Sequence, residues 1–209
     1  MSDKTFYSVV QSRRTTRKFQ NRAVEPDAIH RVLACGLQAP TYNHMREWHF
    51  LFLRDLGLRK RILEESGAFS RTPDKAFLNE TLAKIENPYQ KEVYSYSVPL
   101  QEKILLTAPE VLLVCFKMEK ALSACNTLFE LNNFASAWLA VENILLAMAA
   151  EGLYGVTLVP FRTDKLKDIL GMPEDMEVAT FLPFGYPEKE PAIRQINKAV
   201  QDTIHIDCW

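Results

Sequence analysis

The spacing of hydrophobic positions along the chain changes several times, and it predicts both helices and strands. Apolar residues recur at helical intervals in four segments, which are 4–13, 27–37, 55–66 and 164–170. Short unbroken apolar runs, typical of buried strands, cover 48–53, 111–116 and 178–184. Residues 154–160 fit a strand or an extended loop, and residues 203–206 alternate like an edge strand. Because helices and strands do not alternate steadily, the pattern favours the α+β class.

The longest helical pattern runs from Leu131 to Gly152 and is apolar around much of its circumference. Glu142 and Asn143 lie in its middle and argue against a membrane span. We expect this helix to pass through the centre of the domain, to pack against another subunit, or to do both. The alternating tail at 203–206 is likewise expected to pack on another segment or on a neighbouring chain.

No internal repeat or low-complexity linker divides the sequence, so we expect a single domain over residues 1–209. Between residues 67 and 99 the hydrophobic pattern weakens, and the steps Thr72-Pro73 and Asn87-Pro88 and a group of tyrosines appear. We expect one or two short helices there. This segment is interpreted as a surface excursion that acts as a lid or lies on the substrate side.

The composition is that of an ordinary soluble globular protein, with 47% hydrophobic and 24% charged residues, which excludes long disordered segments. Four cysteines are scattered without a CxxC motif or a His/Cys pair at zinc spacing, so we expect reduced thiols and no structural metal. The first residues lack the long apolar run of a secretory signal. Together these features favour a cytoplasmic protein.

The segment from Ser12 to Phe19 concentrates four cations and three hydroxyls in a chain whose formal net charge is only -1. Guanidinium groups and short hydroxyl donors that converge on one point can bind a phosphate. A solvated basic turn is an equally good interpretation from composition alone. A nucleic-acid surface is less favoured, because the pI is about 6.4 and no basic stripe or base-stacking motif accompanies the cluster.

Two further segments place polar groups next to predicted rigid elements. Residues 39–50, APTYNHMREWHF, connect a predicted helix to a predicted strand and bring Thr, Asn, His and Arg together. His44 and His49 have no carboxylate or cysteine at ligand spacing, so no metal site is expected. After the long helix, the glycines of residues 151–155 (EGLYG) allow backbone N–H groups to approach a flat ligand closely.

Together, these segments resemble the nitroreductase family of FMN-dependent flavoproteins. RRTTRKF is similar to that family's opening RRSxRxF pattern, and APTYNHMREWHF is similar to its APSxxNxQPWxF pattern. Residues 131–160 match its central helix and Gly-rich turn, and FLPFGYP at 181–187 matches its C-terminal strand motif. The resemblance implies a nitroreductase-like α+β fold with a mixed, mostly antiparallel sheet flanked by helices. It also implies a long buried central helix and an extended C-terminal tail.

The resemblance further implies an FMN site at a homodimer interface. Arg13, Arg14 and Thr15 would hold the phosphate and the ribityl chain of FMN. Arg17 would lie near the N1–C2=O edge of the flavin, where a cation stabilises the anionic reduced form. Because the flavin carries the chemistry at its N5 atom, no catalytic side chain is expected.

The 39–50 segment would reach the flavin from the partner subunit through Pro40, Thr41, Asn43 and His44. Counting from Pro40 and Trp48, the family's asparagine falls on His44, and Asn43 comes one position earlier. Either side chain can take that role. The family's Gln-Pro before the tryptophan is also replaced, by Arg-Glu.

The remaining candidates lie in the second half of the chain. Gly152, Tyr154 and Gly155 would lie along the isoalloxazine ring, and Arg194 or Lys198 would supply a second cation for the phosphate. The implied activity takes reducing equivalents from NADH or NADPH to an electron-poor small molecule, such as a nitroaromatic or a quinone, by a ping-pong scheme. Neither nucleic acid nor membrane is expected as a partner.

Three alternatives remain open from the sequence. Some relatives in the family act on halogenated aromatics or on the flavin itself, so reductive dehalogenation and flavin modification are possible chemistries. A flavin-binding protein for storage or sensing would keep the site without turnover. An interaction module with a basic surface would bind no cofactor at all.

Overall fold

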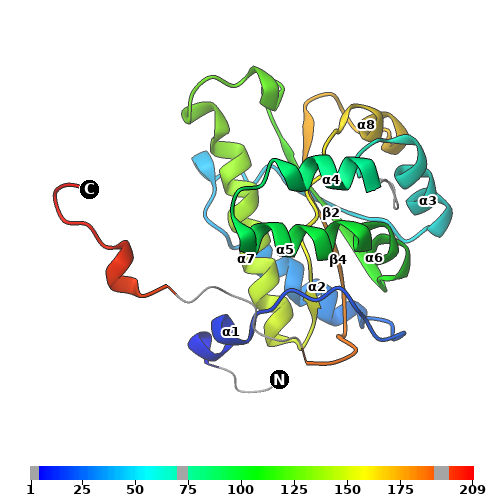
Figure 1. The fold of residues 1–209 in the computed structure, drawn as a ribbon, viewed down its shortest axis with the longest axis horizontal. Helices are drawn as coiled ribbons and strands as arrows, with labels where there is room; N and C mark the ends of the chain where they lie inside the picture. Colours follow the sequence, from blue (N-terminus) through cyan, green and yellow to red (C-terminus); the bar gives the residue numbers. More distant parts are fainter. Residues whose placement is uncertain (1–4, 70–74, 191–197) are drawn as a thin grey trace.

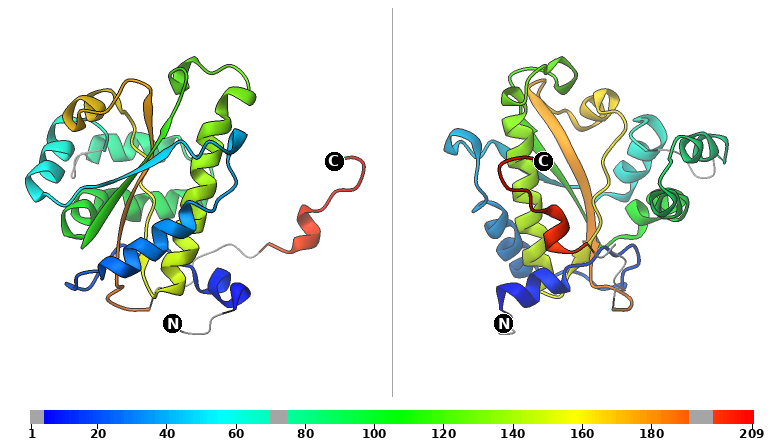
Figure 2. Two further views of the ribbon diagram at one scale, coloured as in Figure 1. Left: turned by 180° about the vertical axis from the view of Figure 1, so that it is seen from behind. Right: turned by 60° about the vertical axis from the view of Figure 1, so that its left-hand side comes forward.

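A four-stranded antiparallel sheet lies between two layers of helices, with the strands in the order β1-β2-β4-β3 (Figures 1 and 2). The computed structural model describes residues 5–69, 75–190 and 198–209. The strands are β1 (Trp48–Phe52), β2 (Glu110–Lys117), β3 (Tyr154–Gly155) and β4 (Met176–Gly185). This arrangement confirms the α+β class and the mostly antiparallel sheet expected from the sequence.

Eight α-helices lie in the described part of the chain. They are α1 (Phe6–Ser12), α2 (Pro26–Gly36), α3 (Leu56–Glu65), α4 (Lys75–Ala83), α5 (Pro88–Ser97), α6 (Gln101–Thr107), α7 (Asn132–Ala150) and α8 (Asp164–Leu170). Short 3₁₀ turns are η1 (Tyr42–His44), η2 (Val98–Leu100), η3 (Leu122–Ala124), η4 (Phe129–Leu131) and η5 (Val200–Thr203). The excursion expected at 67–99 thus contains the two helices α4 and α5.

The central strand β2 is buried on both of its faces. Leu112, Val114 and Phe116 pack into a core formed with α2 and α7. The alternate residues of the strand face a second core, formed with α3, α6 and α8. Because successive side chains of a strand point to opposite faces, a strand buried on both sides is expected to be apolar at nearly every position. The sequence prediction of a buried strand at 111–116 is therefore confirmed.

Burial also determines the chemistry of the single cysteine in β2. Cys115 is 3% exposed within the second core. Desolvation raises the pKa of its thiol to about 12. The thiol is therefore protonated at neutral pH, and because the thiolate is the reactive form, Cys115 is chemically inert.

Helix α7 is the long central helix that the sequence predicts, and it passes across the first core next to α2. Its buried residues are Ser136, Ala137, Ala140, Val141, Ile144, Met148 and Ala149. In the described part of the chain, Phe129–Ala150 is the one helical stretch whose length and composition would suit a membrane span. A buried core helix of a soluble protein has the same length and composition, and α7 packs against the sheet and α2.

Helices α2 and α7 cross closely because Gly36 has no side chain. A Cβ atom built on Gly36 would lie 2.7 Å from Cγ1 of Ile144. Nearby, the Asn143 side chain donates a 3.1 Å hydrogen bond to the carbonyl oxygen of Cys35. This crossing fixes the end of α2, and so the starting point of the loop that leads to η1.

Four sequence expectations differ from the structure. Residues 48–53 were expected to form a buried strand, but β1 is an edge strand that pairs only with β2, so Trp48 alone is buried within it. The pattern at 4–13 predicts Phe6, Val9 and Val10 as the buried side of a helix, but in α1 only Val9 is buried, because the short helix packs by one side on α7. Helix α6 was missed, since seven residues hold too few turns to establish a period.

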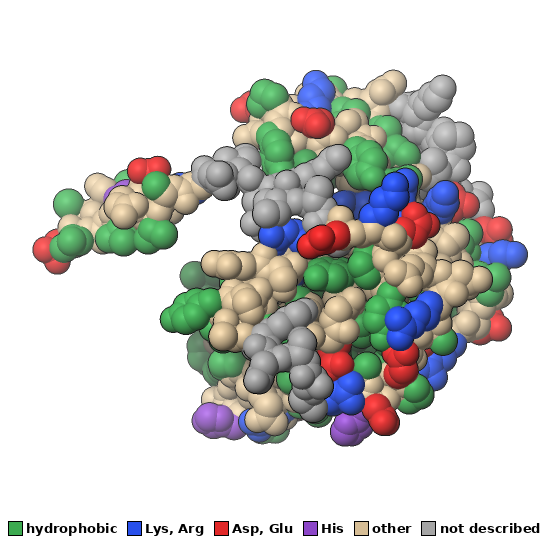
Figure 3. All heavy atoms as spheres, turned by 90° about the horizontal axis from the view of Figure 1, so that it is seen from below, with side chains coloured by type: hydrophobic (Ala, Val, Ile, Leu, Met, Phe, Trp, Pro, Cys, Tyr) green, Lys and Arg blue, Asp and Glu red, His purple; other side chains and the backbone are tan. Residues whose placement is uncertain are grey.

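The fourth difference concerns the tail. Residues 203–206, expected as an edge strand, belong to η5 and to irregular chain. All residues from 198 to 209 are exposed, and Figures 1 and 3 show this segment projecting away from the rest of the molecule. A strand needs a neighbouring strand to satisfy its backbone groups, and the described residues offer none to this segment.

The crossing of α2 and α7 yields a stability prediction. We expect Gly36→Ala to lower the free energy of unfolding by about 1–3 kcal/mol, because the added methyl group overpacks the contact with Ile144. Gly57→Ala, on the exposed side of α3, is the control and is expected to change it by less than about 1 kcal/mol. Urea unfolding measures both. Equal stabilities of the two variants would contradict this account of the crossing.

Candidate functional site

The basic segment after α1 is extended and is attached to the sheet at two points. Thr15 forms a parallel bridge with Gly155, and the N–H of Thr16 donates to the carbonyl oxygen of Gly155 at 3.2 Å. Further along, Phe19 forms an antiparallel bridge with Pro187. Fixed backbone at both ends gives the arginines of this segment defined starting points. An extended stretch of this kind lets several of these groups point at one ligand.

The three arginines of this segment are half-buried rather than fully solvated. The Nε atom of Arg13 lies 3.8 Å from a carboxylate oxygen of Glu142 on α7. Arg14 donates through Nη1 to the carbonyl oxygen of Arg13 at 2.7 Å. On the other side, the guanidinium of Arg17 lies 6.0 Å from the ring centroid of Tyr96 on α5. The cluster therefore occupies the space between α7 and α5.

A second attachment fixes the chain just beyond the cluster. The Arg22 guanidinium lies 3.8 Å from the ring centroid of Tyr186 and pairs with Glu25 at 2.7 Å. The hydroxyl of Tyr186 donates to the same Glu25 carboxylate. The hydrogen bonds from Tyr186 and Arg22 lower the pKa of Glu25 to about 2, and burial is the first cause that raises the pKa of Tyr186. This network links the start of α2 to the end of β4.

The Gly-rich turn after α7 supports the basic segment. Gly152 ends the helix with a φ of 74°, a left-handed conformation that glycine adopts without strain. At Gly155, a Cβ atom would lie 2.8 Å from the carbonyl oxygen of Pro183. This glycine is required for close packing on β4, a reason that the sequence does not reveal. Tyr154 is half-buried between the two glycines.

The loop that precedes β1 has an unusual backbone. Asn43, His44 and Arg46 have φ values of 50°, 57° and 49°, each of which costs a non-glycine residue about 1 kcal/mol. The N–H of Tyr42 donates to Oγ of Ser136 on α7 at 2.9 Å. The side chain of Arg46 donates to the carbonyl oxygen of Leu37 at 3.0 Å. These bonds hold the loop in a conformation that leaves Asn43 and His44 exposed.

The structure places the two polar segments along different parts of α7. Thr41 to His44 lie beside Ser136 in the N-terminal half of the helix. The basic segment runs from Arg13, beside Glu142 in the middle of the helix, to Thr15, beside Gly155 beyond its C-terminus. Ser136 and Ala150 are separated by about 21 Å of helix at 1.5 Å per residue. Figures 1 and 2 show the loop, in light blue, on the upper half of α7 and α1 at its lower end. Within one chain, the two groups of candidates do not meet.

The remaining cation candidates lie in the tail region. Lys198 is exposed at the start of the projecting segment 198–209. Arg194 lies outside the described residues. The role expected for either in binding a phosphate stays a prediction.

Comparison with known proteins adds a decisive observation. The model of the Nitroreductase family matches residues 10–186, which is most of the chain. The chain belongs to the nitroreductase family. The family resemblance drawn from the RRTTRKF and APTYNHMREWHF motifs is thereby confirmed, and the protein is a member of this superfamily of flavoproteins.

Relatives within the nitroreductase family carry two kinds of name. Iodotyrosine deiodinase 1 of Sus scrofa is 26% identical over 208 residues, covering 96% of this chain and 68% of that protein. A provisionally named NADH dehydrogenase/NAD(P)H nitroreductase of Methanothermobacter thermautotrophicus is 25% identical over 209 residues. The match covers 96% of this chain and 85% of that protein. A crystal structure of oxidized iodotyrosine deiodinase bound to FMN and 3-iodo-L-tyrosine superimposes with a TM-score of 0.75 at 20% identity, covering 98% and 100% of the two chains.

Three supporting residues of this nitroreductase-family site were missed by the sequence reasoning. In the sequence, Glu142 serves only as evidence against a membrane span, and Ser136 belongs to no recognised motif. Tyr186 was noted only as part of the FLPFGYP motif. Each contacts a segment more than 90 positions away in the sequence, namely Arg13, Tyr42 and Glu25 respectively. Of these three, the motif containing Tyr186 gave the one usable signal.

The packing of Gly155 provides a test of how the basic segment is supported. We expect Gly155→Ala to lower the free energy of unfolding by about 1–3 kcal/mol, because the backbone oxygen of Pro183 cannot rotate away from the new methyl group. The amide of Thr16, which donates to Gly155, should exchange with solvent faster. Hydrogen exchange and urea unfolding measure the two effects. Thr157→Ala is the control, and unchanged Thr16 exchange in Gly155→Ala would contradict the assignment.

Proposed function

We propose that this nitroreductase-family protein is an FMN-dependent oxidoreductase that works as a homodimer in the cytoplasm. It would transfer reducing equivalents from NADH or NADPH to a small electron-poor acceptor such as a nitroaromatic or a quinone. The observation that carries the proposal is the half-buried group of Arg13, Arg14 and Arg17, attached to β3 at Gly155. When bound, FMN supplies hydride transfer through its N5 atom.

The charges of the basic segment fit the phosphate of FMN. Arg13 has a carboxylate, Glu142, at 3.8 Å, a distance at which the charges are only loosely paired. Arg14 donates to a neutral carbonyl oxygen and has no ion pair within the described part of the chain. Two guanidinium groups with little neutralising charge between them favour a dianion. The hydroxyl of Thr15 is exposed beside them and adds a short hydrogen-bond donor.

The other residues of the segment would orient the ring system and limit the entry of water. Arg17 would provide the cation at the N1–C2=O edge, and its contact with Tyr96 places α5 next to that edge. Helix α5 has no buried residue, so it is held loosely enough to act as the lid expected from the sequence. The isoalloxazine ring of FMN would lie on a backbone surface formed by Gly152, Tyr154 and Gly155.

A homodimer would complete the site. Pro40, Thr41, Asn43 and His44 do not meet the basic segment within one chain, so they would contact FMN held by the other subunit. Exposed apolar side chains on α1, α7 and the tail support an interface between subunits; they are Phe6, Tyr7, Leu139, Ile206 and Trp209. On this proposal a second copy, rather than lipid, covers the exposed side of α7.

Removing the paired cations tests the cofactor site. We expect Arg13→Ala/Arg14→Ala to weaken FMN binding by at least about 100-fold, since a charge-assisted hydrogen bond contributes about 1.5–3 kcal/mol. Quenching of FMN fluorescence on titration with protein measures the dissociation constant. The control, Arg61→Ala/Lys84→Ala, removes two cations from exposed ion pairs elsewhere and should leave FMN binding unchanged. A double variant that purifies with full flavin would refute the assignment.

Reductive dehalogenation of a halogenated aromatic is the second candidate function, and the 26% identity to iodotyrosine deiodinase 1 supports it. Turnover assays of the flavin-loaded protein separate the two candidates. We expect NADH or NADPH to bleach the flavin absorbance and a quinone to restore it. Bleaching by dithionite alone, followed by iodide release from 3-iodo-L-tyrosine, would favour the dehalogenase. Flavin binding without turnover of either acceptor would favour a storage or sensing protein.

A further inference from the structure

The loop between β2 and η4, residues 120–130, keeps its shape without a core of its own. Every residue from 121 to 130 is exposed or half-buried. Leu128 and Phe129, the large apolar residues at its end, are 87% and 68% exposed. Leu122 and Cys125 pack by one side on the core shared with α2 and α7, so burial helps to hold the first part of the loop. Residues 126–130 depend mainly on polar contacts.

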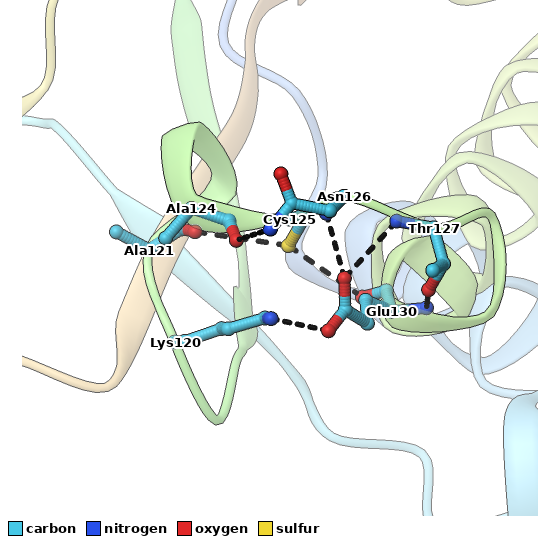
Figure 4. Close-up of polar contacts among 7 residues, drawn as sticks. All are labelled: Lys120, Ala121, Ala124, Cys125, Asn126, Thr127 and Glu130. Carbon is cyan, nitrogen blue, oxygen red and sulfur yellow. Dashed lines mark hydrogen bonds and ion pairs between the residues drawn. The ribbon is translucent and has the colours of Figure 1, made fainter.

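Those polar contacts converge on one carboxylate, that of Glu130 (Figure 4). Its Oε2 accepts hydrogen bonds from the backbone N–H groups of Asn126 at 2.7 Å and Thr127 at 3.1 Å. In return, Oγ1 of Thr127 accepts from the N–H of Glu130 at 3.4 Å. This reciprocal pair has the bonding pattern of a capping box and fixes the turn that leads into η4.

The other oxygen of Glu130 closes the loop at its far end. Oε1 pairs with the ammonium group of Lys120, ten positions earlier in the sequence. The hydrogen bond from Lys120 is the first cause that lowers the pKa of Glu130 to about 2. Glu130 is therefore ionised at any pH at which an enzyme of this kind would be assayed, and the closure does not vary with pH in that range.

The turn held by Glu130 contacts the strained loop of the candidate site. The ring of Phe129 meets the ring of Tyr42 edge-on, with centroids 5.6 Å apart. Tyr42 is the first residue of η1, which continues into Asn43 and His44 with their positive φ values. The Ser136 hydroxyl that accepts from Tyr42 N–H lies on α7, which begins at Asn132, directly after η4. Both supports of Tyr42 thus depend on the same stretch of chain.

We propose that Glu130 is a positioning residue for the site. Its carboxylate fixes the 120–130 loop, Phe129 then supports Tyr42, and Tyr42 fixes the backbone that presents Asn43 and His44. The inference rests on the proposed function in one respect, that Asn43 and His44 contact FMN in the other subunit. The effect on the η1 loop itself does not depend on FMN.

A carboxylate is needed because one group must accept from three donors at two places in the loop. In Glu130→Gln, one oxygen becomes a donating NH₂ group that repels the Lys120 ammonium or the backbone N–H groups, so one set of bonds is lost. In Glu130→Ala all three bonds are lost. The two variants should therefore loosen the 120–130 loop, and the η1 loop that it supports, to different degrees. Glu130→Gln should have the smaller effect and Glu130→Ala the larger.

Hydrogen exchange tests the positioning directly. The amides of His44 and Met45 are bonded to the carbonyl oxygens of Thr41 and Tyr42 at 3.3 Å, so their protection reports on the η1 loop. We expect their exchange to be about tenfold faster in Glu130→Ala, since bonds to a charged acceptor are lost, and less accelerated in Glu130→Gln. The affinity of the dimer for FMN should fall in the same order, least in Glu130→Gln and most in Glu130→Ala. The control Glu65→Ala breaks an exposed ion pair with Arg61 on α3 and should change neither quantity.

A double variant tests the route through Phe129. If Glu130 acts through that ring, Glu130→Ala should add little to the acceleration already caused by Phe129→Ala, because effects that share one contact do not add. Fully additive effects would overturn the route. Should Glu130→Ala fail to fold, Lys120→Gln and Glu130→Gln carry the same test, since each breaks the closure with a smaller change.

The outcomes separate this inference from the proposed function. Unchanged exchange at His44 and Met45 in folded variants would overturn the positioning role, whatever the wild type binds. If the wild-type protein binds no FMN but His44 and Met45 still exchange faster in the variants, the positioning role is supported and the proposed function is overturned. Faster exchange with undisturbed FMN affinity would overturn the inferred contact of this loop with the flavin.

Discussion

Burial of β2 and β4 on both faces is the constraint on which the rest of the structure depends. Every residue of β4 is buried, and so are the six central residues of β2. Neither strand has space for a ligand, and the buried polar side chains of β4, Glu177 and Thr180, are already bonded to Lys167 and to the backbone. Binding groups are therefore confined to the periphery of the sheet, on segments attached to it by backbone bonds. The extended segment from Arg13 to Phe19 is one such attachment, and the closely packed Gly155 makes it possible.

The parts of this fold that were predictable have long, uniform patterns. The helical pattern at 131–152 predicts α7, and the unbroken apolar run at 111–116 predicts β2. In both cases the local pattern of apolar residues matches the burial of the element. What could not be predicted depends on contacts between distant residues. Nothing near Val10 in the sequence shows that α1 buries only one side, and nothing near Gly155 shows that Pro183 lies 2.8 Å from where its Cβ would be.

The candidate site follows the same division. The motifs located the basic segment, the 39–50 loop and the Gly-rich turn, because their residue types are chemically unusual in short stretches. They did not reveal that the loop and the basic segment lie along different parts of α7. They also did not identify the supporting residues Ser136 and Glu142, whose roles exist only once the chain has folded.

The departures from the nitroreductase motif before Trp48 have structural roles here. Arg46, in the place of the family's glutamine, donates to the carbonyl oxygen of Leu37 at the end of α2. A carboxylate oxygen of Glu47, in the place of proline, lies 4.0 Å from Nζ of Lys117 on β2, next to the backbone bond that joins the same two residues. Cationic side chains near a helix C-terminus satisfy its last carbonyl groups. The substituted pair thus anchors the loop at both ends.

The two cores lie on opposite sides of the sheet, and this separates the molecule into parts that can change independently. Helices α4 and α5 lie on the side of α3 and α6, whereas α2 and α7 lie on the other (Figure 2). The contact of Arg17 with Tyr96 is where α5 meets the basic segment. Mutations that reshape α4 and α5 therefore leave the packing around α7 intact. On the proposed function, changes confined to α4 and to the part of α5 away from Tyr96 could alter which acceptor enters, while Arg13, Arg14 and Gly155 continue to hold FMN.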